Sequence, residues 1–242
     1  MKKSVLSKLV ACLALVMLLT ASVEAQNSSS IPPTLSGKAR EYYAGAVQGD
    51  VFSMVALAVC YQNGDCAPQS CDMARDWYQK AAEMGNVIAQ YNLAVIYDEG
   101  DCVPRNLEVA TYWYQRAAAQ GDALAQCSLA NCYYEGDYFK QDYTKAFNWW
   151  EKAAMQGNAA AQRCLGICYD EGKGVKKNQK KAAEWYLKAA EQGDSDAQYN
   201  LGALYLDGKG VKKNKKKAAE WLGKAAAQGD EDAIELLKKI KK

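Results

Sequence analysis

The chain has 242 residues, half of them hydrophobic, and a formal net charge of +2. This balance provides no overall attraction to nucleic acid, so nucleic acid is not expected as a partner. The sequence contains no histidine, which removes the most common catalytic base and the usual partner of a nucleophilic serine or cysteine. No cofactor is expected, and no metal site.

The first 25 residues have the composition of a secretory signal peptide. Three lysines lie within residues 2–8, an apolar run covers 9–19, and residues 23–25 (VEA) fit a signal-peptidase site. An alternative uses residues 9–12 (LVAC) as a lipoprotein cleavage site. The apolar run is short for a bilayer span. We therefore expect a cleaved signal and a secreted or periplasmic protein without a transmembrane span.

A polar linker, residues 26–33, precedes a region that repeats every 36 residues up to residue 242. One tryptophan, one tyrosine and one leucine recur in five successive copies, at about 50–85, 86–121, 122–157, 158–193 and 194–229. A fixed period in this range is typical of a stacked repeat array, in which each unit buries its apolar face against its neighbours. The tryptophans are Trp77, Trp113, Trp149, Trp185 and Trp221.

Each copy contains the start and stop signals of two helices. Residues that cap helix N-termini well recur at the start of the second helix, and glycines that close helices recur after both. The pattern predicts an all-α fold: a right-handed α–α superhelix, or solenoid, of five 36-residue helix-turn-helix repeats. Capping helices are expected at 34–48 and 230–242, giving twelve helices and no strands. The predicted caps are Ser70, Asn106, Asp142, Asn178 and Asn214.

The fourth copy reads AQxxLGxxYxxGxGVxxNxxKAAxWYxKAAxQG over residues 161–193. This motif resembles the Sel-one-like repeat family, a branch of the tetratricopeptide-like α-solenoids. The resemblance implies that the first helix of every repeat lines a concave face. The exported, cysteine-bearing chain is also similar to the Cys-rich secreted bacterial members. Their characteristic pairing of cysteines near repeat junctions is absent here, so their disulfide pattern does not transfer.

One arc of the first helices varies between repeats while the opposite, packing arc does not. The resemblance implies that the variable arc is the concave surface. Asparagine amides there suit a peptide backbone, and tyrosines offer rigid apolar area, so we expect a non-catalytic scaffold or adaptor that binds a peptide or protein partner in the concave groove. Simple solvation of these residues is the alternative. The predicted contact residues are Ile88, Tyr91, Asn92, Asn131, Tyr134, Arg163, Tyr199 and Asn200.

Charge is distributed unevenly along the chain. Residues 26–171 have a net charge of −7 and residues 172–242 a net charge of +7. The Lys-rich end is a candidate site for an anionic partner, such as an anionic envelope polymer, or a solubilising edge. Four carboxylates recur in the last turns of successive first helices. They could form an acidic ladder, a row that faces a basic ligand. The simpler interpretation is that they are solvated residues at the helix ends. This row comprises Glu99, Glu135, Glu171 and Asp207.

Eight cysteines remain after the signal, an even number that favours disulfides in an exported chain. Three pairings are conceivable from their places in the repeats. They are Cys60–Cys71 within one hairpin, Cys66–Cys102 between equivalent turns, and Cys127–Cys164 across neighbouring first helices.

The resemblance also raises one enzymatic alternative, because some Cys-rich secreted relatives carry a penicillin-binding or β-lactamase label. That chemistry normally uses a serine with a lysine three residues later. Neither S-x-x-K nor S-D-N nor K-T-G occurs in the chain. An enzyme is therefore not expected, and β-lactamase-type hydrolysis is kept only as the alternative function.

Overall fold

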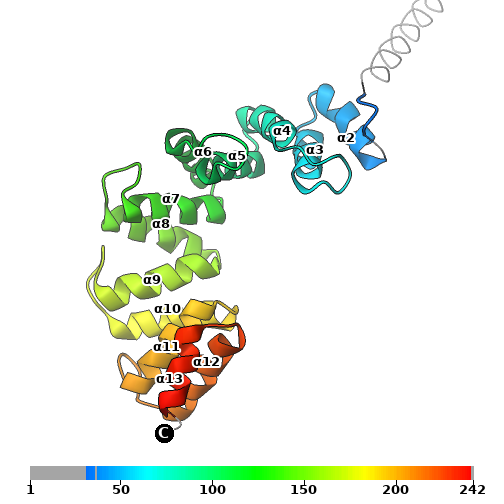
Figure 1. Cartoon of the computed structure of the whole chain (residues 1–242). Coiled ribbons are helices and arrows are strands. Elements are labelled where there is room, and N and C mark those ends of the chain that lie inside the picture. The colour runs from blue at the N-terminus through cyan, green and yellow to red at the C-terminus, as the bar shows by residue number, and fades with distance from the viewer. Residues whose placement is uncertain (1–30, 36, 241–242) are drawn as a thin grey trace, which may run out of the picture. The chain divides into compact units, whose positions relative to one another are not determined.

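A computed structural model describes residues 31–35 and 37–240. Within these residues the chain forms twelve α-helices and no strands (Figure 1). Five helix pairs, α3–α4 to α11–α12, correspond to the five repeats, with α2 and α13 on either side. The predicted all-α solenoid of five helix-turn-helix repeats with flanking helices is confirmed. The helices are α2 Lys38–Val47, α3 Val51–Asn63, α4 Cys71–Glu83, α5 Val87–Glu99, α6 Leu107–Ala119, α7 Ala123–Glu135, α8 Tyr143–Met155, α9 Ala159–Glu171, α10 Gln179–Glu191, α11 Ser195–Asp207, α12 Lys215–Ala227 and α13 Glu231–Ile240.

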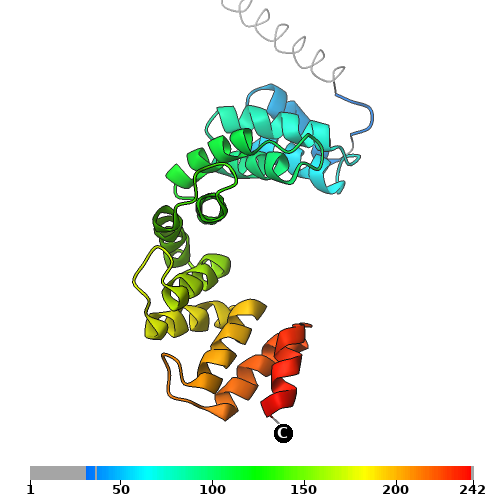
Figure 2. The same ribbon diagram turned by 60° about the vertical axis from the view of Figure 1, so that its left-hand side comes forward.

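Two compact units make up the chain, one ending at Ala89 and the other beginning at Gln90. In the first unit α3 packs against both α2 and α4. In the second unit each helix from α7 to α12 packs against the helix before it and the helix after it. The loops after α9 and α11 project from the same side of this unit in both views (Figures 1 and 2). The predicted signal peptide, residues 1–25, lies outside the described residues.

Helix ends follow the predicted signals. The side chain of Asn178, for example, accepts a hydrogen bond from the backbone N–H of Lys181 at the start of α10. Gly172 ends α9 in the left-handed conformation, with φ 81°. The turn between the two is closed by the backbone N–H of Asn178, which donates to the carbonyl of Tyr169 at 2.7 Å. The other four predicted caps make the same side-chain bond, at Ser70, Asn106, Asp142 and Asn214.

The N-terminal capping helix differs from the expected range of 34–48. Helix α2 begins at Lys38, and Gly37 before it makes no side-chain capping bond. Thr34 therefore does not cap a helix, although it stands one period before the true cap Ser70. At the start of α11, the side chain of Asp194 accepts from Ala197 N–H at 2.8 Å, and Ser195 is the first helical residue.

The five recurring tryptophans lie on the second helices of the repeats, and a cationic side chain of the same helix covers each ring. A lysine or arginine three residues after each tryptophan lies over its ring, as a helix permits. The ammonium of Lys152 is 3.8 Å from the centre of the Trp149 ring, and that of Lys224 is 3.8 Å from the Trp221 ring. Lys80, Arg116 and Lys188 stand in the same relation to Trp77, Trp113 and Trp185.

A buried glutamine connects each of the last three repeats to the repeat before it. Gln162 on α9 donates through Nε2 to the carbonyl of Ala154 near the end of α8, at 3.1 Å. Its Oε1 accepts from Gln192 at the end of α10, at 2.8 Å. One side chain thus joins three consecutive helices. Gln126 and Gln198 make the equivalent pairs of bonds.

The two helices of a repeat approach most closely where a small residue faces the partner helix. A Cβ added to Gly166 on α9 would lie 2.4 Å from the ring of Tyr186 on α10. The same addition at Gly202 would lie 2.7 Å from Leu222. The three earlier repeats have an alanine at this position.

We predict that Gly166→Ala destabilises the protein, since the Tyr186 ring must move; overpacking of this kind costs about 1–3 kcal/mol. Gly223→Ala is the matched control, because this helical glycine has open space around its Cβ position and alanine favours a helix by up to about 1 kcal/mol. Urea unfolding followed by circular dichroism measures both changes. Equal midpoints for the two variants would contradict the packing argument.

We also predict that Gln162→Glu destabilises the protein by about 3 kcal/mol at neutral pH, because a buried carboxylate would face the carbonyl of Ala154 in place of the amide donor. Burial raises the pKa of such a carboxyl in the folded state, so the lost stability returns as the pH falls and the acid form donates again. Gln162→Met has no titrating group, and its loss should be independent of pH over this range. Unfolding at several pH values separates the two.

Candidate functional site

A cavity of about 410 Å³ opens between α7, α8 and α9 in the second unit. Its floor is Trp150 of α8, which is 3% exposed. Helix α7 forms one wall and helix α9 the other, so the cavity spans two neighbouring first helices. The lining residues are Cys127, Asn131, Tyr134, Glu135, Trp150, Ala160, Arg163, Cys164 and Ile167.

Asn131 and Trp150 depend on each other. The indole Nε1 of Trp150 donates to Oδ1 of Asn131 at 3.0 Å. The residues at the position of Asn131 in the other four repeats are Val59, Val95, Ile167 and Ala203, so only the third repeat has this polar partner. The bond occupies the acceptor of Asn131 and leaves its amide N–H groups for the carbonyl of a ligand.

Tyr134 forms the aromatic corner of the cavity. Its ring centre lies 5.2 Å from that of Trp150 and 5.2 Å from that of Tyr143. Its hydroxyl accepts a 2.7 Å hydrogen bond from the ammonium of Lys173. This ammonium also lies 2.8 Å from a carboxylate oxygen of Glu171. The corner is therefore rigid, with both the ring and the hydroxyl held.

Arg163 lies on the opposite wall and is held by two carboxylates. Its Nε is 3.1 Å from Asp194 and its Nη1 is 3.2 Å from Asp196. Asp194 is also the N-cap of α11. Arg163 thus ties α9 to the next repeat, and its half-buried charge is already balanced. We expect its alkyl stem to contribute more to the cavity than its charge.

A second, smaller cavity of about 170 Å³ lies on the other side of α7. Asn131 and Glu135 line both cavities, which makes the exposed face of α7 the ridge between them. Acidic groups dominate the smaller cavity, with Asp98, Glu135 and Asp137 facing a single arginine. Its other lining residues are Arg105, Leu107, Ser128, Cys132 and Tyr138.

The structure brings together three of the eight predicted contact residues: Asn131, Tyr134 and Arg163. Tyr199 instead packs against the small core formed by α12 and α13. Tyr91 is half-buried, with its ring 6.0 Å from that of Tyr114. The remaining three are not among the residues that line this cavity. Ile88, in the first unit, is exposed, while Asn92 and Asn200 are half-buried.

Sequence reasoning missed the floor and part of one wall. Trp150 occupies the repeat position that holds Tyr78, Tyr114, Tyr186 and Leu222 in the other repeats, so the sequence did not distinguish it from a core residue. Ile167 occupies the same repeat position as Asn131, and the variability of this position was the signal that could have identified it.

Across residues 31–35 and 37–240, no cluster of three or more Cys, Asp or Glu side chains is arranged to hold a metal ion.

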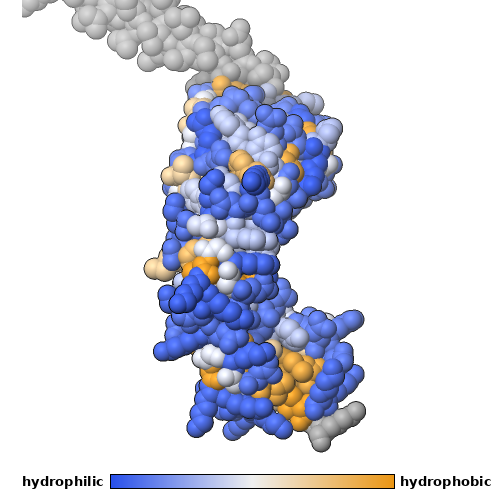
Figure 3. Space-filling view, turned by 90° about the vertical axis from the view of Figure 1, so that its left-hand side faces the viewer, coloured by the Kyte–Doolittle hydropathy of each residue, from blue (hydrophilic) through white to orange (hydrophobic). Residues whose placement is uncertain are grey.

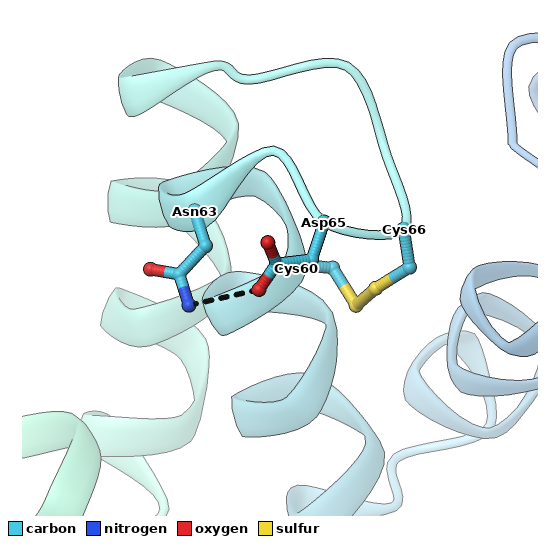
Figure 4. Close-up of a disulfide and its surroundings, with 4 residues drawn as sticks. All are labelled: Cys60, Asn63, Asp65 and Cys66. Carbon is cyan, nitrogen blue, oxygen red and sulfur yellow. Dashed lines mark hydrogen bonds between the residues drawn. A yellow bond between two sulfur atoms is a disulfide. The ribbon is translucent and has the colours of Figure 1, made fainter.

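The predicted disulfide pairings are wrong. Cys60 is bonded to Cys66, with their Cα atoms 5.2 Å apart (Figure 4). This excludes both Cys60–Cys71 and Cys66–Cys102. The reason is local: Gly64 reverses the chain with φ 77°, which returns Cys66 to the last turn of α3, and Asn63 bonds Asp65 within the same turn at 3.2 Å. Cys71 and Cys102 are also disulfide-bonded.

The predicted Cys127–Cys164 bridge is not formed either. Both side chains line the large cavity as free thiols, and Cys132 and Cys168 are free as well. Burial raises the pKa of Cys127 to about 11 and that of Cys164 to about 12. These thiols are therefore poor nucleophiles at neutral pH, which argues against cysteine catalysis in the cavity.

Five Sel1 repeats match this chain, at residues 51–86, 87–122, 123–158, 159–194 and 195–230. The chain therefore belongs to the Sel1 repeat family, as the motif predicted. Proteins built from these repeats are generally protein-interaction scaffolds. A comparison with curated proteins gives no match.

Solved structures of the same kind are similar to this chain. It is 36% identical to c5321, a protective antigen present in uropathogenic Escherichia coli strains, with a TM-score of 0.78 over 82% of this chain and 43% of that one. This chain thus spans less than half the length of that antigen. A Sel1 repeat protein from Oxalobacter formigenes is 30% identical, with a TM-score of 0.76 over 84% of this chain and 83% of that one.

The bridge between Cys60 and Cys66 indicates an oxidising compartment outside the cytoplasm. From residue 31 to residue 240, residue 36 aside, the structure contains no helix with both the length and the apolarity to cross a bilayer.

We predict that the four free thiols react slowly with iodoacetamide in the native protein. At pH 8 a thiol with a pKa of about 11 is ionised in about one molecule in a thousand, so labelling of Cys127 and Cys132 should rise steadily up to pH 10. Cys164 and Cys168, with pKa values of about 12, should be slower still. Mass spectrometry reports each site, and urea-unfolded protein is the control. Rapid native labelling of Cys164 at pH 8 would contradict its burial.

Proposed function

We propose that this protein is a non-catalytic interaction scaffold that holds an extended segment of a partner protein in the large cavity between α7 and α9. The observation that supports this most is the composition of the cavity. An apolar floor and wall, Trp150 and Ile167, lie beside amide and carboxylate groups on α7. Binding sites for peptides and small ligands share this arrangement of an apolar pocket with few, well-placed polar groups.

The two parts of the cavity suit the two parts of a peptide. An apolar side chain of the partner buries against the indole of Trp150 and the side chain of Ile167. The amide of Asn131, held by Trp150, donates to a backbone carbonyl of the same segment. Because Tyr134 and Arg163 are fixed by bonds to other repeats, little side-chain entropy is lost on binding.

The setting proposed for this activity is outside the cytoplasm. The Cys60–Cys66 bridge supports it, and so does the signal-like composition of residues 1–25. Hydrolysis of the β-lactamase type has no support in the large cavity, whose lining includes no serine.

A second candidate is the binding of an anionic envelope polymer by the Lys-rich end. The lysines of the loops after α9 and α11 are mostly exposed. Both loops lie on one side of the second unit (Figures 1 and 2). The loop-bearing side of that unit is predominantly hydrophilic (Figure 3). This binding would weaken steeply with salt, whereas capture of an apolar anchor in the cavity would not.

We predict that a photo-crosslinking residue placed at position 167 captures a protein partner in the native cell. The matched control places the same residue at Met155, which is 73% exposed at the end of α8 and does not line the cavity. The expected result is a discrete conjugate from position 167 that is absent from position 155. The additional change Trp150→Leu should reduce its yield by removing most of the apolar floor. Equal conjugates from both positions would refute binding in the cavity.

A further inference from the structure

We infer that the partner segment carries a lysine or arginine, whose cationic side chain binds in the smaller cavity among Asp98, Glu135 and Asp137. This inference rests on the proposed function, because the same segment must also occupy the large cavity. It names the chemistry of the partner, which the proposed function leaves open. Equivalent positions in successive repeats support it.

In the last two repeats the chain supplies this cation itself. Glu171, the last residue of α9, binds the ammonium of Lys173 at 2.8 Å. Asp207, the last residue of α11, binds Lys209 at 2.6 Å. Both lysines lie two residues after the carboxylate, past the glycine that ends the helix. The pKa of each lysine is raised, chiefly by its hydrogen bond to that carboxylate.

The repeat before also contributes to each of these lysine sites. Lys173 donates to the hydroxyl of Tyr134 and lies 5.0 Å from the centre of its ring. Lys209 is stabilised by Asp170, which occupies the position of Tyr134 one repeat later. A cation therefore lies between the last residue of one first helix and the penultimate residue of the preceding first helix.

The smaller cavity has the same two walls and no lysine. Glu135 occupies the place of Glu171, and Asp98 occupies the place of Tyr134. The position of the lysine is held by Asp137, which adds a third carboxylate. Of the recurring last-turn carboxylates, Glu99 and Glu135 are each followed two residues later by a further carboxylate, at Asp101 and Asp137, whereas Glu171 and Asp207 are followed by lysines.

The charge of this edge reverses between the two halves of the second unit. Residues 98–105 and 134–141 carry five carboxylates and two cations, a net charge of −3. The equivalent residues 170–177 and 206–213 carry three carboxylates and six lysines, a net charge of +3. A cationic side chain is therefore attracted to the smaller cavity and repelled from its later equivalents.

The cations already present do not satisfy this cavity. Arg105 bonds the carbonyl of Asp98 at 2.8 Å and its carboxylate at 3.2 Å. Lys140 lies in the following loop and makes no ion pair within the described residues. Among those same residues, Glu135 and Asp137 are likewise in no ion pair. Two carboxylates thus remain for a partner, which can be bound through bifurcated, charge-assisted hydrogen bonds.

The two cavities set the spacing of the partner residues. They share Asn131 and Glu135 on the ridge of α7, and a helix with its side chains is about 10 Å across. An extended chain advances about 3.3 Å per residue. The apolar anchor and the cation should therefore be separated by about three residues.

The test uses fluorescein-labelled peptides in a Gly-Ser background, with one leucine and a variable residue about three positions away on either side. The variable residue is lysine, glutamine or glutamate, and fluorescence anisotropy measures binding to the whole protein. We expect the lysine peptide to bind about tenfold more tightly than the glutamine peptide and the glutamate peptide to bind most weakly. Equal affinity for the lysine and glutamine peptides would overturn the inference and leave the scaffold proposal standing.

Two single variants identify the site. Asp137→Asn removes a carboxylate that lines the smaller cavity and not the large one, so it should lower the affinity for the lysine peptide toward that for the glutamine peptide and leave the glutamine peptide unchanged. Asp207→Asn removes the same charge where Lys209 already neutralises it, and should have little effect on either peptide. An equal loss in both variants would show long-range attraction and overturn the inference. Failure of all three peptides to bind the unaltered protein would refute the scaffold proposal itself.

Discussion

The structure depends on a buried glutamine that each of the last three repeats directs at the repeat before it. Gln162 donates to a carbonyl at the end of α8 and accepts from Gln192 at the end of its own hairpin. Helix C-termini carry carbonyls that lack an intrahelical partner. The carbonyl of Ala154 accepts from the backbone N–H of Gly157 and, in addition, from a side chain of the next repeat. This bond fixes where each hairpin begins relative to the last. In the first repeat, methionines replace both glutamines of the pair, at Met54 and Met84.

Because packing, capping and the glutamine bonds use one side of each hairpin, the opposite arc of the first helices is free to differ. The third and fourth repeats show what this freedom allows. Asn131 and Trp150 form a pair found in no other repeat, and Arg163 has two carboxylates to bind at the start of α11. These departures from the repeat pattern meet at one cavity. The features that distinguish the repeats, rather than those they share, therefore define the candidate site.

Much of the fold was readable from the sequence because its signals are local and repeated. The caps at Asp142 and Asn178 and the left-handed Gly172 depend only on residues a few positions away. The disulfides were not readable in this way. Cys60 and Cys71 stand at plausible helix ends, but the path of the intervening turn decides that Cys66 is closer. Tyr199 failed for another reason. Its repeat position is buried or half-buried in all five repeats, and Tyr199 packs against the core of α12 and α13. Trp150 was not predicted as a site residue, because the other repeats have a tyrosine or leucine of the core at the same position.

The way in which adjacent hairpins are joined has a consequence for how such a protein changes. The carbonyl that one hairpin presents and the glutamine that the next one brings are alike at successive junctions. A hairpin can therefore be duplicated, deleted or exchanged as a block without a new interface having to be built. The lysine or aspartate that follows each first helix travels with its block. Ligand preference in this architecture can thus evolve by shuffling whole hairpins, while the framework that supports them stays intact.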